Sequence, residues 1–165
     1  MLNKRLSAFT ISELMIALAL TGIMTSFAYM GFNYTQKLLH QFNEQNYFIV
    51  QFTELNKRLN LLSGSVNEVI MEDENRFVLK SDSINCKIAF NPKYILLNMS
   101  GMIDTFHLKV VGLKSGFEIM NHPLWENKLI NHIAFDVVYQ KEIFHMSFNK
   151  NYDAYSKIIL ETQNN

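Results

Sequence analysis

The 165-residue sequence predicts an α+β fold. We expect a long N-terminal helix, with one half apolar enough to span a membrane and the other half amphipathic, packed on an antiparallel β-sheet head. The first observation behind this is an apolar run without charges from Leu14 to Gln36, followed by apolar residues at helical spacing. The second is that from Ser65 onward the hydrophobic period falls from 3.6 residues to 2.

The composition excludes several classes of protein. Lys and Arg total 15 and so do Asp and Glu, which excludes a broadly basic nucleic-acid binder and an acidic disordered chain. Cys86 is the only cysteine, so neither a disulfide framework nor a multi-cysteine metal site is expected. The length suits either one domain of ordinary size or a small domain with an appended element.

The first element is the apolar helix that contains the run Leu14–Gln36. About 20 apolar residues suffice to cross a bilayer as a helix. Lys4 and Arg5 precede the run and no basic pair follows closely, which predicts a cytoplasmic N-terminus and an exported head. Three other readings compete: a cleaved secretory signal peptide with Ser26-Phe27-Ala28 at its cut, a plain single-pass anchor, and a buried core helix.

Glu13 stands at the edge of this run, where an acidic group is costly. Thr10 and Glu13 have the spacing of a capping box, in which Thr10 caps the helix and Glu13 reaches back to the Thr10 backbone. A carboxylate there also complements the positive end of the helix dipole. This spacing predicts that the helix starts near Thr10.

The segment from Lys4 to Leu18 resembles the N-terminal signal of type IV pilins and type II secretion pseudopilins. That signature has a short basic leader ending in a small residue, then a Phe-Thr stretch with a Glu, then an apolar helix. The resemblance implies cleavage between Ala8 and Phe9, N-methylation of Phe9, and an assembly role for Glu13. The sequence departs from the usual pattern at Ala8, where Gly is common, and at Ser12, where an apolar residue is common.

The resemblance and the composition together predict four parts of the chain: a leader (1–8), a transmembrane or filament-core helix (9–36), an amphipathic helix (37–64) and a β-rich head (65–165). Together they have the form of a pilin-like lollipop. Ser63-Gly64 is the expected end of the helix. The predicted core stripe of the amphipathic part has spacings of 3, 4 or 7 residues and comprises Leu38, Phe42, Ile49, Phe52, Leu55, Leu59 and Leu62.

The head is predicted to be an antiparallel sheet, because apolar and polar residues alternate between turn signals. The expected strands are 66–72, 76–81, 84–90, 93–99, 106–111, 117–120, 132–139 and 144–149. Lys114-Ser115-Gly116 is among the expected turns. The segment Asp153–Thr162 fits either a last strand or a short helix.

No catalytic residue, metal ligand or cofactor is predicted. The histidines His40, His107, His122, His132 and His145 lack the spacing of a zinc site. Glu72-Asp73-Glu74 lacks the spaced oxygens of a calcium loop and is expected to be a solvated turn. Cys86 is expected to be a buried small hydrophobe, and the lone Trp125 either core or a contact.

The expected function is therefore that of a minor pilin or pseudopilin-like structural subunit of a pilus-like filament for secretion, DNA uptake or motility. The alternative is a single-pass, membrane-anchored, exported binding module that does not assemble. The expected partners are other pilin-like subunits, a prepilin peptidase, an inner-membrane assembly platform and membrane lipid. Nucleic acid is expected only indirectly, through a DNA-uptake filament. The expected location is the bacterial inner membrane, with the head in the periplasm or at the cell surface.

Overall fold

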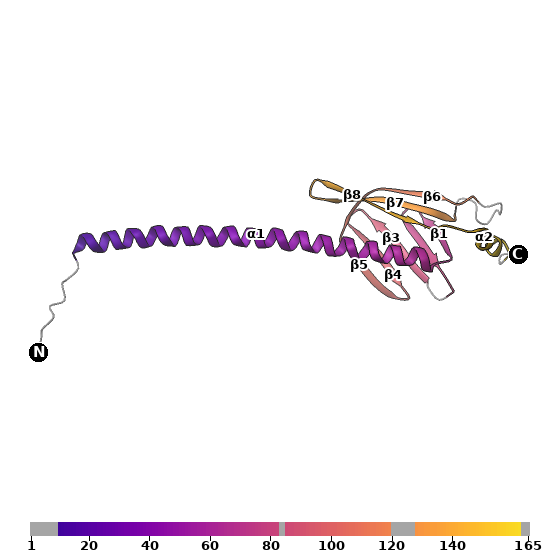
Figure 1. Ribbon diagram of the computed structural model, residues 1–165, viewed down its shortest axis with the longest axis horizontal. Helices are drawn as coiled ribbons and strands as arrows, with labels where there is room; N and C mark the ends of the chain where they lie inside the picture. Colours follow the sequence, from indigo (N-terminus) through magenta and orange to yellow (C-terminus); the bar gives the residue numbers. More distant parts are fainter. Residues whose placement is uncertain (1–9, 83–84, 120–127, 163–165) are drawn as a thin grey trace, which may run out of the picture. The chain divides into compact units, whose positions relative to one another are not determined.

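The computed structural model describes residues 10–82, 85–119 and 128–162, and its elements have the α+β order predicted from the sequence (Figure 1). Helix α1 (Ile11–Ser65) comes first, antiparallel strands follow, and helix α2 (Ala154–Thr162) comes last. The described strands are β1 (Glu68–Asp73), β2 (Arg76–Lys80), β3 (Asn85–Asn91), β4 (Tyr94–Met99), β5 (Met102–Phe106), β6 (Lys109–Phe117), β7 (Ile130–Tyr139) and β8 (Glu142–Asn149). The chain divides into two compact units between Asn46 and Tyr47.

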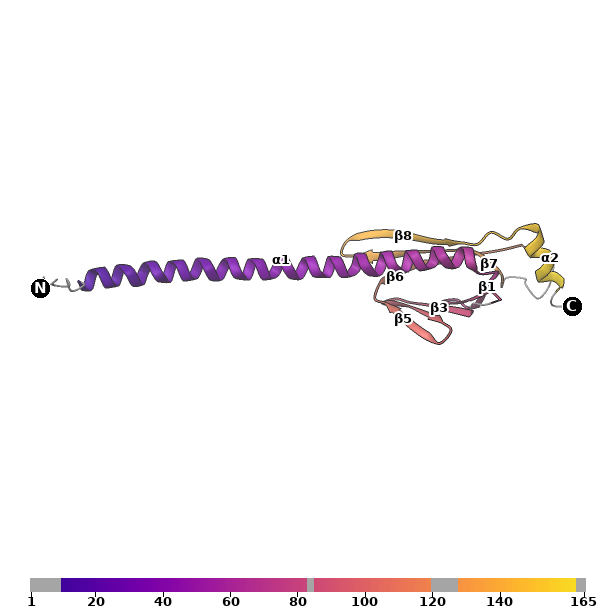
Figure 2. The same ribbon diagram turned by 60° about the horizontal axis from the view of Figure 1, so that its bottom comes forward.

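The second unit, which we call the head, is built around one main hydrophobic core. Its helical side is formed by the last turns of α1, whose buried residues are Phe48, Leu55, Leu59 and Leu62. Both sheets complete the core, for example through Phe77 and Phe135, and the views agree that these turns run beside both (Figures 1 and 2). Full burial of one such side chain contributes about 1.5–3 kcal/mol, so this contact fixes the helix end in the head.

The predicted core stripe was right for its C-terminal members and wrong for its N-terminal ones. Phe52 packs against the core, whereas Leu38, Phe42 and Ile49 are about half exposed or more. At 3.6 residues per turn, these three lie roughly 100° around the helix from the centre of the buried set. The predicted stripe therefore combined residues from two different faces of the helix. Phe48, and not Ile49, is the buried residue at this level of the helix.

The strands form two sheets where the sequence predicted one. The first has the meander order β1-β2-β3-β4-β5 and the second has the order β6-β7-β8. The predicted strand 106–111 is interrupted because Leu108 N donates to Phe106 O (2.9 Å), a tight turn that ends β5 before β6 begins. Leu129, directly before β7, forms an isolated antiparallel bridge with Ile70 of β1 and so links the two sheets.

The predicted turn Lys114-Ser115-Gly116 was wrong, because these residues lie inside β6. Val111 pairs with Asp136 and Lys114 with Ala134, so β6 holds one extra residue, a β-bulge. Gly112 provides it with φ of 64°, and a Cβ there would come within 3.4 Å of the Asp136 carboxylate. Of the predicted strand 117–120, only Phe117 is in a strand, and residue 120 lies outside the described part.

Tyr152 ties the two sheets together. Its buried hydroxyl donates to Ile130 O (2.9 Å) in β7 and accepts from Val69 N (3.0 Å) in β1. Burial raises the pKa of this hydroxyl, which keeps it protonated. The next residue, Asp153, accepts a hydrogen bond from Ser156 N (2.7 Å), and this cap settles the ambiguous segment as helix α2.

Adjacent leucines at the end of α1 provide a test of the core face. Leu62 is 3% exposed and Leu61 is 61% exposed. In the segment 37–165, which retains the whole main core, we expect Leu62→Ala to lower the free energy of unfolding by about 2–5 kcal/mol. The matched Leu61→Ala should change it by less than about 0.5 kcal/mol. Urea unfolding followed by circular dichroism measures both, and equal losses would contradict this orientation of α1.

Tyr152→Phe tests the tie between the sheets. The change keeps the ring but leaves Val69 N–H and Ile130 C=O without their buried partner. We expect the free energy of unfolding to fall by about 1–3 kcal/mol in the same urea experiment. Tyr94 is 37% exposed, so Tyr94→Phe is the control and should be close to neutral. A neutral Tyr152→Phe would show that the hydroxyl does not hold the sheets together.

Candidate functional site

Helix α1 begins at a reciprocal pair of hydrogen bonds between Thr10 and Glu13. Thr10 N and Thr10 Oγ1 both donate to Glu13 Oε2, each at 2.9 Å. Glu13 N donates to Thr10 Oγ1 (3.4 Å), and Leu14 N donates to Thr10 O (3.2 Å). This is the geometry of a capping box, which satisfies N–H groups that the first turn otherwise leaves without partners.

Ser12 joins this network, which the sequence analysis missed. Its Oγ lies 3.1 Å from Thr10 Oγ1. The only signal in the sequence is a pair of hydroxyl residues two positions apart at a helix start, and such pairs are common in caps. Three side chains, from Thr10, Ser12 and Glu13, therefore share one chain of hydrogen bonds.

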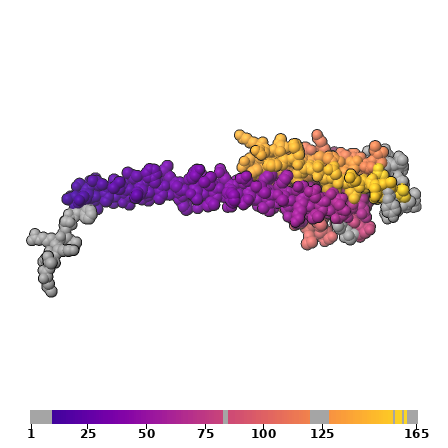
Figure 3. All heavy atoms as spheres, viewed as in Figure 1, coloured from indigo at the N-terminus to yellow at the C-terminus, as the bar shows by residue number. Residues whose placement is uncertain are grey.

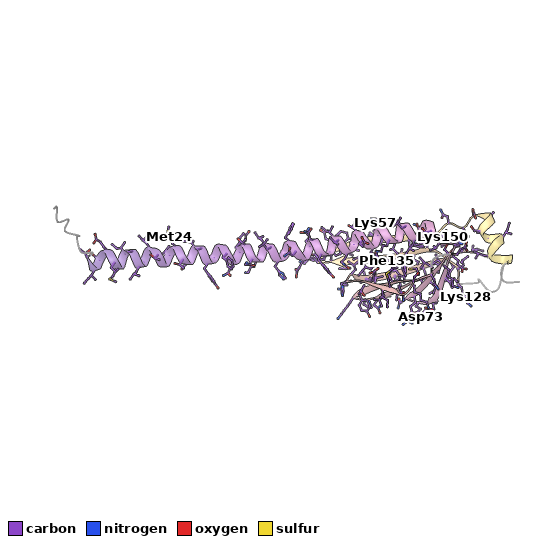
Figure 4. All side chains as sticks on the ribbon, turned by 90° about the horizontal axis from the view of Figure 1, so that it is seen from below. Met24, Lys57, Asp73, Lys128, Phe135 and Lys150 are labelled. Atoms are coloured by element: carbon purple, nitrogen blue, oxygen red, sulfur yellow. The ribbon has the colours of Figure 1, made fainter. Side chains whose placement is uncertain are left out.

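The apolar stretch after Glu13 is long enough to cross a membrane, and none of its most apolar window is buried within the protein. Leu14, Leu18 and Phe27 are each more than half exposed, and Met24, labelled in Figure 4, is 75% exposed. Figure 3 draws this part of α1 as spheres, in indigo. An apolar surface this extended marks a membrane or protein contact, so the reading of a buried core helix is wrong.

The Ser and Thr hydroxyls within this stretch are satisfied by the helix itself. The hydroxyls of Thr21, Thr25, Ser26 and Thr35 each donate to the backbone carbonyl four residues earlier, at 2.6–2.9 Å. Water is absent from a bilayer core, and an unpaired hydroxyl there is costly. These internal bonds therefore suit the helix to apolar surroundings.

Of the remaining residues weighed in the sequence analysis, some lie outside the described part of the chain, and the described histidines make ordinary side-chain contacts. Ala8 and Phe9 lie outside the described residues, as do His122 and Trp125. His40 pairs with Glu44 (3.3 Å) and His145 with Asp136 (2.5 Å). His107 contacts the hydroxyl of Tyr47 (3.2 Å), and His132 contacts Asn149 (2.5 Å).

Two further candidates have ordinary structural roles. Glu72, Asp73 and Glu74 are exposed at the β1–β2 turn, and Glu72 pairs with Lys87 (3.1 Å). Among the described residues, no group of three His, Cys, Asp or Glu side chains could hold a metal ion. Cys86 is fully buried, and burial raises the pKa of its thiol to about 11, so it is a poor nucleophile.

One known family model matches the N-terminal segment of the chain, which includes the start of α1. Residues 3–29 match the family model of the prokaryotic N-terminal methylation motif, which is typical of type IV pilins and pseudopilins. No curated protein and no solved structure matches the chain. The matched segment contains Ala8, Phe9, Thr10 and Glu13. The match points to a structural, pilin-type protein, and the apolar helix is consistent with a single-pass membrane anchor.

Proposed function

We propose that this protein is a minor pilin or pseudopilin-like structural subunit of a pilus-like filament that serves secretion, DNA uptake or motility. The observation that carries the proposal is the position of Glu13, in the first turn of α1, directly before the exposed run 14–36 that carries no charge, and inside the matched methylation motif. In this role the chain is a substrate of processing enzymes and not an enzyme itself.

Processing supplies the partner that Glu13 needs. Cleavage between Ala8 and Phe9 creates a positive amine, which is then methylated. When apolar helices pack side by side, the Phe9 amine of one subunit and the Glu13 carboxylate of its neighbour neutralise each other in surroundings without water. A charge in such surroundings is costly unless it is paired, so the pair sets how far each subunit rises past the next.

The two halves of α1 have different roles in this proposal. Residues 9–36 hold the chain in the inner membrane and later form the filament core, while residues 37–64 lead into the β-rich part of the chain and, through Leu55 and Leu59, anchor it. The leader 1–8 stays cytoplasmic, and the β-rich part 65–165 is exported to the periplasm or cell surface. The partners are other pilin-like subunits, a prepilin peptidase, an inner-membrane assembly platform and membrane lipid.

Processing is tested by mass spectrometry of the chain extracted from membranes of a pilus-assembling cell. We expect an N-terminus at Phe9 that carries an N-methyl group. Cleavage after Ala28 would identify a secretory signal peptide and overturn the proposal. An intact Met1 would identify the alternative, an anchored binding module that does not assemble.

Assembly is tested by Glu13→Gln. Gln keeps the reach back to the Thr10 backbone, so insertion and cleavage should be unchanged. The neighbour's amine is left unpaired, at a cost of about 3–5 kcal/mol, so the tagged chain recovered with other pilin-like subunits should fall by two or more powers of ten.

Glu44→Gln is the matched control for this test. Glu44 lies on the same helix, beyond the apolar run, and is exposed and paired with His40. We expect the variant to assemble normally. Normal assembly of Glu13→Gln would reduce Glu13 to a helix cap and remove the main support for a filament subunit.

A further inference from the structure

Ser12 differs from the other serines and threonines of the apolar part of α1. Those at 21, 25, 26 and 35 each donate to the carbonyl four residues back, as helical hydroxyls commonly do. Ser12 stands in the first turn, where the residue four places back precedes the helix. Its hydroxyl instead lies 3.1 Å from the Thr10 hydroxyl.

Counting protons fixes the direction of this contact. The Thr10 hydroxyl has one proton, which it donates to Glu13 Oε2. Thr10 Oγ1 can therefore only accept from Ser12, whose hydroxyl is the donor. With the bond from Glu13 N, Thr10 Oγ1 then donates once and accepts twice, which is the full capacity of a hydroxyl.

The same counting applies to Glu13. Its Oε2 accepts two hydrogen bonds from Thr10, so the orientation of the carboxylate is fixed through that oxygen. Among residues 10–82, 85–119 and 128–162, no hydrogen bond or ion pair to Oε1 is found. Capping and pairing therefore use different oxygens, and Glu13 can cap its own helix while Oε1 faces a cation.

We propose that Ser12 is a positioning residue for Glu13: its hydroxyl holds that of Thr10 in place, which keeps the proton of Thr10 on Oε2 and leaves Oε1 for a neighbour's N-terminal amine. The inference rests on the proposed function, because the amine is the Phe9 terminus created by processing. A donor that is itself an acceptor is polarised and donates more strongly, so the effect of Ser12 reaches the carboxylate through Thr10.

The test compares assembly of variants of the full chain, measured as the tagged subunit recovered in cross-linked complexes from membranes. Ser12→Ala should lower recovery about three- to tenfold, the size expected for one net hydrogen bond. Ser12→Thr retains a hydroxyl and should restore most of it. Ser26→Ala removes a hydroxyl bonded only to its own helix and should have no effect. Normal assembly of Ser12→Ala would overturn the inference, and so would failure of Ser12→Thr to restore recovery.

A second background separates positioning from general helix stability. Thr10→Val keeps the side-chain shape but removes the hydroxyl through which Ser12 acts. In that background we expect Ser12→Ala to cause no additional loss, whereas an additive loss would overturn the inference. If Glu13→Gln abolishes assembly but Ser12→Ala does not, the inference alone fails. If Glu13→Gln assembles normally, the proposed function fails and the inference fails with it.

Discussion

The contact between the last turns of α1 and both sheets is the interaction on which the head depends. Leu55, Leu59 and Leu62 are almost completely buried, while each sheet presents its own apolar face to them. Neither sheet is large enough to bury its face alone, since antiparallel sheets of three or five strands need a covering layer. The helix supplies that layer. The hydrogen bonds of the Tyr152 hydroxyl and the bridge between Ile70 and Leu129 join β1 to β7 and to the residue directly before β7.

A second constraint acts on the apolar part of α1, where each polar group needs a partner within the helix or on another subunit. The Ser and Thr hydroxyls between residues 21 and 35 meet this need by donating to the backbone of their own helix. At the helix start, the backbone N–H and the hydroxyl of Thr10 both donate to the same oxygen of Glu13, Oε2. In the filament that we propose, the other oxygen, Oε1, is the one that faces the amine of a neighbouring subunit.

The sequence predicted the fold class and the helix start well, because both depend on local patterns. The uncharged run, the Thr10–Glu13 spacing and the alternation in β3 and β8 needed no knowledge of distant contacts. The errors fall where distant contacts decide. The bulge at Gly112 exists because β6 must stay in register with β7, and the exposed face at Leu38 looked like core because periodicity alone does not say which face is covered.

The strand order has a consequence for synthesis. Every pairing in the five-stranded sheet joins strands that are consecutive in the sequence, so its strand pairing can be complete once Phe106 has been made. Its apolar face includes Phe90, which packs on Phe135 of β7 with ring centroids 4.9 Å apart. During synthesis that face must wait for strands made later, so an unfinished head exposes apolar surface that can aggregate. In the membrane-anchored subunit that we propose, α1 holds such an unfinished head beside the membrane until β6, β7 and β8 have been made.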